Sequence, residues 1–209
     1  MDIQNQKENL ISHLKSEGYI QSKRVEQAFR KIPRENFLPK EMGPYAYSDH
    51  PLPIGSSQTI SAPHMVAIMT ELLQPAKTDK VLEIGAGSGY QAGILSPLVR
   101  KIYTIEFYPE LASLAKKNLS RTKIKNVDVI PADGSKGLPE KAPYDKIIVT
   151  CSIPEQVFHS LAKQLKEGGI IVAPVGEAYG IQMLTTGRKA KGRLETKEYF
   201  PCVFVPLRG

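Results

Sequence analysis

The sequence predicts an α/β fold in which a doubly wound, mostly parallel sheet has antiparallel strands at its C-terminal edge and a helical N-terminal extension. Between residues 80 and 175 short apolar runs alternate with stretches of helical periodicity, the pattern of a parallel sheet covered on both faces. A glycine-rich turn follows the first apolar run. Beyond residue 180 the apolar runs follow one another without intervening helices, which predicts antiparallel strands.

Two helices are expected near the N-terminus. Residues 5–15 and 22–31 repeat apolar side chains at helical spacing. Ser22 is a suitable N-cap for the second helix, and Pro33 ends it. Residues 34–63 are rich in proline, glycine and hydroxyl side chains and show little periodicity. Because an irregular segment of this length inside a compact domain is usually functional, we expect an ordered contact loop there.

The rest of the chain divides into alternating strands and helices. Apolar runs predict strands at residues 81–84, 101–106, 127–131, 146–150, 170–175, 181–185 and 203–205. Helical periodicity predicts helices from Pro63 to Leu73 and at residues 90–98, 109–119 and 154–166. Gly168 and Gly169 are expected to close the last of these helices.

Length and composition indicate one domain. A chain of 209 residues can bury an ample core without disulfides, and its 41% apolar and 23% charged content is ordinary for a globular enzyme. Within residues 1–209 we expect three parts. Residues 1–63 would supply the N-terminal helices and the contact loop, residues 64–180 a ligand-binding core, and residues 181–209 the C-terminal strands.

Charge and cysteine content restrict partners and location. The chain carries 28 basic and 21 acidic residues, but its densest basic stretches, 116–125 and 188–193, lack interleaved aromatic side chains, so we expect no nucleic-acid partner. The N-terminus is too polar for a signal peptide, and no run approaches the roughly 18 apolar residues of a membrane span. We therefore expect a cytoplasmic monomer without a membrane partner. Cys151 and Cys202 form no C-x-x-C pair, and no metal site is expected.

The turn after the first predicted strand of the core is Gly85-Ala86-Gly87-Ser88-Gly89. Its glycines let a ligand lie against the backbone. Glu106 follows 21 residues after Gly85 at the end of the second strand, where an acid suits ribose hydroxyls. The dinucleotide fingerprint needs its third glycine where Tyr90 stands, and Glu83 would disfavour a pyrophosphate but suit a sulfonium. The spacing therefore favours S-adenosylmethionine over a nicotinamide dinucleotide.

A further acid follows the third strand of the core. Asp133-Gly134 would lie at the same edge of the sheet as Glu83 and Glu106, and its carboxylate could accept a hydrogen bond from an adenine amino group. Asp before Gly is also common in ordinary turns. Coincidence is a weaker explanation than function for three acids at the ends of three successive strands. We therefore include Asp133 and Gly134 in the expected cofactor site.

Several motifs together resemble the protein-L-isoaspartate (D-aspartate) O-methyltransferase family over nearly the whole chain. The most specific is Gln58-Thr59-Ile60-Ser61-Ala62-Pro63-His64-Met65, within the contact loop and the helix after it. Others are Pro33-Arg34-Glu35-Asn36-Phe37-Leu38-Pro39, the glycine turn and Val203-Phe204-Val205-Pro206-Leu207.

This resemblance implies the Rossmann-like fold of S-adenosylmethionine-dependent methyltransferases. It also implies methyl transfer to the free carboxylate of L-isoaspartyl and D-aspartyl residues in damaged proteins, which initiates their repair and leaves S-adenosyl-L-homocysteine. Isoaspartyl-containing peptides and proteins would be the partners. The resemblance makes Ser61 the active-site serine and implies substrate contacts from Ile54, Thr59, Ile60 and His64.

Other interpretations of these residues stay open. Ser61 could be the N-cap of the helix that runs to Leu73. His64 could have a packing or orienting role, because methylation of a carboxylate needs no general base. Cys151 could be there as a small side chain near the cofactor. Ala132 and Ser57 stand where the family usually has glycine, which weakens the adenine assignment and stiffens the loop. An RNA-directed methyltransferase is an alternative suggested by the charge alone.

Overall fold

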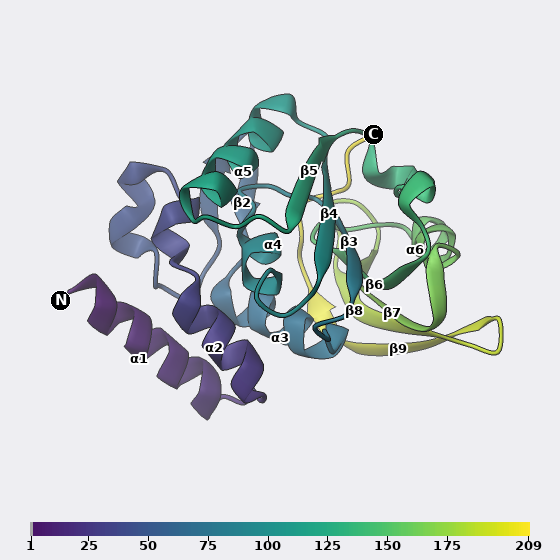
Figure 1. The fold of residues 1–209 in the computed structure, drawn as a ribbon, viewed down its shortest axis with the longest axis horizontal. Coiled ribbons are helices and arrows are strands. Elements are labelled where there is room, and N and C mark those ends of the chain that lie inside the picture. Colours follow the sequence, from purple (N-terminus) through teal and green to yellow (C-terminus); the bar gives the residue numbers. More distant parts are fainter. Residues whose placement is uncertain (1) are drawn as a thin grey trace.

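A seven-stranded sheet organises the computed structural model, which describes residues 2–209 (Figure 1). The strand order is β5-β4-β3-β6-β7-β8-β9. Strands β5, β4, β3, β6 and β7 pair in parallel, whereas β8 is antiparallel to β7 and β9 is antiparallel to β8. The predicted mostly parallel sheet with antiparallel C-terminal edge strands is confirmed.

The strands of this sheet are β3 (Lys80–Ile84), β4 (Lys101–Glu106), β5 (Val127–Pro131), β6 (Tyr144–Val149), β7 (Leu165–Gly176), β8 (Gln182–Ala190) and β9 (Arg193–Cys202). The α-helices are α1 (Ile3–Ser16), α2 (Lys23–Lys31), α3 (Pro63–Leu73), α4 (Tyr90–Leu95), α5 (Pro109–Arg121) and α6 (Glu155–Ala162). The 3₁₀ helices are η1 (Arg34–Phe37), η2 (Lys40–Tyr45), η3 (Gly134–Lys136) and η4 (Pro139–Lys141), and a separate hairpin pairs β1 (Leu52–Gly55) with β2 (Gln58–Ile60).

Each face of the sheet has its own hydrophobic core. Val81 and Val172 point into a cluster shared with buried side chains of α1 to α5. Their sequence neighbours Leu82 and Ile171 point into a second cluster, with Phe158 of α6. Successive strand residues alternate between faces, so apolar runs without alternation are what a sheet covered on both sides requires.

The N-terminal helices form where periodicity placed them, and Ser22 caps α2 by accepting a hydrogen bond from the backbone N–H of Val25 at 3.3 Å. Both helices contribute buried residues to the core on the α3 side of the sheet. The segment 34–63 has more regular structure than its lack of periodicity predicts. It holds η1, η2 and the β1–β2 hairpin, which are too short to show a period in the sequence.

The predicted ends of two helices are wrong. Helix α4 ends at Leu95, not at residue 98, and α6 ends at Ala162, not at residue 166. Strand β7 begins already at Leu165, opposite Tyr144, and the register shifts before the pairing resumes. Gly168 and Gly169 therefore lie in an irregular part of a strand, because tertiary pairing with β6 overrides the local glycine signal for a helix end.

The C-terminal hairpin differs from its expected length. Strands β8 and β9 are far longer than the short apolar runs that predicted strands, and their tip lies at Lys191 and Gly192. Residues 203–205 form no strand, which corrects the prediction. Instead the Val205 carbonyl accepts a hydrogen bond from the N–H of Ser152, and the Phe204 N–H donates to the Gln182 side chain. This tail thus lies against the residues that follow β6.

None of the helices described for residues 2–209 is long and apolar enough to cross a membrane.

Candidate active site

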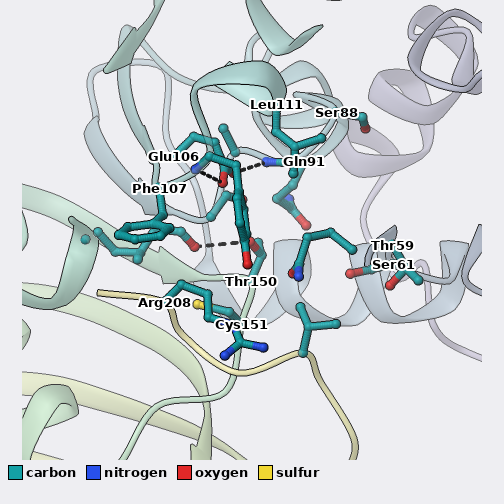
Figure 2. Close-up of a pocket in the computed structure, with 18 of the residues that line it drawn as sticks. Thr59, Ser61, Ser88, Gln91, Glu106, Phe107, Leu111, Thr150, Cys151 and Arg208 are labelled. Atoms are coloured by element: carbon teal, nitrogen blue, oxygen red, sulfur yellow. Dashed lines mark hydrogen bonds between the residues drawn. The ribbon is translucent and has the colours of Figure 1, made fainter. Parts of the chain in front are cut away.

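The candidate site lies where the chain leaves two neighbouring strands for opposite faces of the sheet. Strand β3 leads to α4 on one face, and its neighbour β6 leads to α6 on the other. This divergence opens a crevice at the carboxyl ends of parallel strands. A cavity that is partly open to solvent occupies this position. Its walls come from the glycine turn, the end of β4 and Thr150 (Figure 2).

The glycine turn needs glycine for both conformation and space. Gly85, Gly87 and Gly89 all have positive φ, at 94°, 53° and 86°. A Cβ on Gly85 would lie 2.6 Å from Thr150 Oγ1, which is too close for any side chain. Gly85, Ala86, Gly87 and Ser88 line the cavity, whereas Gly89 does not, and contact of this backbone with a ligand stays a prediction.

Glu106 lies at the carboxyl end of β4, as predicted, and its carboxylate lines the cavity. Its Oε2 accepts a hydrogen bond from the Gly87 N–H at 2.7 Å, and its Oε1 accepts one from the Tyr108 N–H at 3.1 Å (Figure 2). These bonds hold the carboxylate against the glycine turn. A charged acceptor is therefore fixed beside the cavity, although its ribose contact stays a prediction.

Glu83 does not line this cavity. It is fully buried in β3, and neither of its carboxylate oxygens has a hydrogen-bond partner within residues 2–209. Burial raises the pKa of Glu83 to about 8, with a further contribution from the charge of Glu106, while Thr104 opposes the shift. The structure thus places Glu83 beneath the glycine turn as a group that stays protonated at neutral pH.

The residues after β5 divide into one that faces the cavity and one that does not. Gly134 lines the cavity, and a Cβ there would lie 2.6 Å from Ile84 Cγ2. Asp133 caps η3, because its carboxylate accepts hydrogen bonds from the N–H and the hydroxyl of Ser135 at 2.8 and 2.9 Å. These contacts are those of an ordinary turn residue, the alternative that the sequence left open for Asp133. A contact between Asp133 and adenine stays a prediction.

A larger groove adjoins the first cavity, and the two share a boundary. Thr59, Ser61 and Thr150 line both. Figure 2 shows Thr59 and Ser61 across the cavity from Phe107. The hydroxyl of Ser61 makes no hydrogen bond within the described chain, and Ala62 is the N-cap of α3, so the capping interpretation of Ser61 is wrong.

The other residues predicted to contact substrate lie at different depths. Ile60 lines the first cavity and His64 lines the groove. Ile54 is buried, and its Cδ1 would lie 3.3 Å from a Cβ on Gly87. Ile54 therefore supports the glycine turn from behind.

Thr150 and Arg208 are two of the lining residues that went unpredicted. The Thr150 hydroxyl, at the end of β6, donates to the Gly85 carbonyl at 2.6 Å, and only the strand order shows that these residues meet. Arg208 lines both cavities and donates to the Tyr179 hydroxyl at 2.9 Å. Cys151 lines the first cavity, and burial raises its pKa to about 12, which fits a packing role.

Comparison with known proteins gives one family. A family model described as protein-L-isoaspartate(D-aspartate) O-methyltransferase matches residues 5–209. The protein-L-isoaspartate O-methyltransferase of Staphylothermus marinus is 50% identical over 216 residues, which cover 99% of this chain and 96% of that protein. The enzyme of the same name from Methanopyrus kandleri is 48% identical over 207 residues, which cover 97% of this chain and 91% of that protein.

Solved structures agree. A protein-L-isoaspartate O-methyltransferase superposes with a TM-score of 0.86 at 31% identity, covering 97% of this chain and 66% of that chain. A Plasmodium falciparum chain, described as a beta-aspartate methyltransferase in complex with S-adenosyl-L-homocysteine, has a TM-score of 0.82 at 24% identity and covers 96% of this chain and 97% of that chain. The latter shows the same fold.

Gly85→Ala is expected to weaken binding of S-adenosyl-L-homocysteine by at least about tenfold, because strain of roughly 1–3 kcal/mol and the clash with Thr150 would displace the turn. Isothermal titration calorimetry measures the affinity. Gly192→Ala is the matched control, since Gly192 has a φ of 74° at the hairpin tip with open space around it. Equal affinities for both variants would contradict the assignment of the turn.

Glu83→Gln is expected to make stability less dependent on pH. The folded wild type holds its Glu83 proton up to about pH 8, whereas the unfolded chain releases it near pH 4.5. Between these values the wild type therefore loses stability relative to the variant, by up to roughly 1.4 kcal/mol per pH unit. Urea unfolding from pH 5 to pH 8 measures the difference, with Glu198→Gln in exposed β9 as control. Parallel curves for wild type and Glu83→Gln would refute a buried, protonated Glu83.

Proposed function

This chain belongs to the protein-L-isoaspartate(D-aspartate) O-methyltransferase family, and from its site we propose how its residues carry out that reaction. The protein is a methyltransferase that uses S-adenosylmethionine to methylate the free carboxylate of L-isoaspartyl and D-aspartyl residues in damaged proteins, which initiates repair. The observation that carries the assignment of roles is the shared boundary of the two cavities. Ser61 and Thr150 lie on it, between the first cavity and the open groove.

The first cavity fits S-adenosylmethionine on its own geometry. It lies at the carboxyl ends of the parallel strands, and part of its wall is backbone without side chains at Gly85 and Gly87. We assign Gly85, Ala86, Gly87, Ser88 and Gly89 to cofactor binding. We assign Glu106 to the ribose hydroxyls and Asp133 with Gly134 to the adenine end. Buried Glu83 would support the turn from below.

The bound cofactor supplies a methyl group made electrophilic by a sulfonium. The acceptor carboxylate is already an anion, so the protein needs no general base. Ser61 would donate one hydrogen bond to a carboxylate oxygen and turn the other toward the cofactor. Thr59 and Ile60 would hold the acceptor backbone, His64 would contact it farther along the groove, and Ile54 would keep the hairpin in place. Such positioning can contribute roughly 7–11 kcal/mol.

We further propose that residues 1–209 act as one methyltransferase domain and that the protein works as a cytoplasmic monomer. In this division residues 1–63 supply the hairpin that carries Thr59 and Ile60, residues 64–180 the cofactor site, and residues 181–209 one wall of the groove. Its partners would be isoaspartyl-containing peptides and proteins, with neither nucleic acid nor membrane among them. Light scattering after size exclusion tests the monomer.

Purified protein is expected to methylate an isoaspartyl peptide and to leave the aspartyl peptide of the same sequence unmodified. Transfer of label from methyl-labelled S-adenosylmethionine measures both rates. Calorimetry with NAD in place of S-adenosyl-L-homocysteine is the ligand control, and no binding of NAD is expected. Equal rates on the two peptides, or none on either, would remove the substrate assignment.

Ser61→Ala is expected to lower kcat/KM for the isoaspartyl peptide about 10- to 100-fold, the loss of one hydrogen bond to a charged group. Affinity for S-adenosyl-L-homocysteine should change less than about twofold, because the hydroxyl faces the acceptor. Ser56→Ala is the matched control on the same hairpin, since Ser56 donates to Glu110 outside both cavities. A parallel loss of cofactor affinity in Ser61→Ala would contradict this placement.

A further inference from the structure

An aspartate–histidine pair lies at the edge of the groove, and only its histidine has a part in the reaction as described so far. His64 is the second residue of α3, and Asp49 lies in the loop between η2 and β1. The Asp49 Oδ1 accepts a hydrogen bond from the His64 backbone N–H at 2.9 Å and lies 3.0 Å from the His64 Nδ1. One carboxylate oxygen therefore holds both the start of α3 and the imidazole ring.

A buried cation lies near Asp49, and an aromatic ring packs against His64. Arg34 is fully buried, packs over the ring of Tyr90 at 4.9 Å, and has no hydrogen-bond partner for its guanidinium within residues 2–209. Burial lowers the pKa of Arg34, while Tyr90 and Asp49 oppose that shift, so the Asp49 carboxylate lies within the electrostatic reach of this cation. Tyr19 packs against the other part of the pair, with its ring 5.6 Å from that of His64.

This arrangement selects one tautomer of His64. A carboxylate can only accept, so the ring proton belongs on Nδ1, where it is donated to Asp49. The Nε2 of a neutral ring then carries a lone pair. Because His64 lines the groove and is 34% exposed, Nε2 is the ring nitrogen left to contact an acceptor peptide.

The substrate gives a reason for a second fixed contact. Isoaspartyl and aspartyl residues both have a carboxylate and an amide. In an aspartyl residue the amide is attached to Cα and the carboxylate follows the extra methylene, whereas in an isoaspartyl residue the two groups are exchanged. A contact to the carboxylate alone cannot separate them. A rigid hydrogen-bond acceptor at His64, three residues beyond Ser61, can discriminate between the two, because the peptide N–H groups lie at different positions relative to that carboxylate.

We propose that His64 is a specificity-determining residue, whose Nε2 accepts a hydrogen bond from a backbone N–H of the isoaspartyl peptide, and that Asp49 is the positioning residue that fixes its tautomer. This inference rests on the proposed function and adds to it the atom through which His64 contacts the acceptor and the role of Asp49.

The tautomer can be measured directly. The chain has four histidines, so long-range ¹H–¹⁵N spectra of ¹⁵N-histidine-labelled protein resolve each ring. His64 is expected as the Nδ1–H tautomer in the wild type and in Asp49→Asn, which keeps an oxygen acceptor, and to lose this tautomer in Asp49→Ala. Glu155→Ala, which removes the partner of His159 on the exposed side of α6, is the control and should leave His64 unchanged. An Nε2–H tautomer in the wild type would overturn the proposal.

The contact itself is tested with isoaspartyl peptides in which one backbone amide at a time is N-methylated. At one position the wild type should lose about 3- to 10-fold in kcat/KM, the effect of one neutral hydrogen bond. His64→Ala should show the same loss with the unmodified peptide and be insensitive to methylation at that position. His64→Gln, which retains an acceptor, should recover part of the activity.

Affinity for S-adenosyl-L-homocysteine separates a local effect from misfolding, because neither Asp49 nor His64 lines the cofactor cavity, and it should stay unchanged. The contact would be overturned if His64→Ala kept the kcat/KM of the wild type, or if that variant were equally sensitive to every N-methylated peptide. Either result would leave the proposed function intact. A wild type that methylates no isoaspartyl peptide would instead overturn the proposed function.

Discussion

The close approach of β3 and β6 at their carboxyl ends is the constraint on which the site depends. The Thr150 hydroxyl donates to the Gly85 carbonyl at 2.6 Å, which leaves no room for a side chain on Gly85. On the other side of the turn, the Ile105 carbonyl accepts hydrogen bonds from the N–H groups of Gly85 and Ala86, and Glu106 binds Gly87. The turn is thus held by both neighbouring strands, and the cavity exists because these three strands are adjacent.

The charges around the cavity suit a reaction that removes charge. A sulfonium and a carboxylate combine into a neutral ester and a neutral thioether, so surroundings that solvate ions strongly would stabilise the reactants more than the transition state. Burial keeps Glu83 protonated at neutral pH, and Cys151 stays a neutral thiol. Among the residues that line the two cavities, the acidic side chain is Glu106 and the basic ones are Arg208 and His64, and each has a protein partner.

Contacts between distant segments also fix the walls of the groove beside the first cavity. The β1–β2 hairpin reaches the glycine turn through Ile54, and α3 starts where Asp49 binds the His64 N–H. The C-terminal tail closes the opposite wall through the bond between Ser152 and Val205. Segments from both ends of the chain therefore meet over the end of β6, and this explains why the groove adjoins the first cavity.

The sequence by itself determined the order and type of the main elements, because apolar runs, glycines and prolines act through local backbone preference and burial. It also identified the glycine turn, Glu106 and the Ser61 loop, whose residues are neighbours in the chain. Strand order and register were decided by the tertiary structure, since pairing between β6 and β7 overrides the glycine signal at Gly168. The same holds for Thr150 and Arg208, which reach the site from distant segments, and for Asp49, which contacts His64. Contacts of this kind depend on which strands are adjacent, and no local pattern records that adjacency.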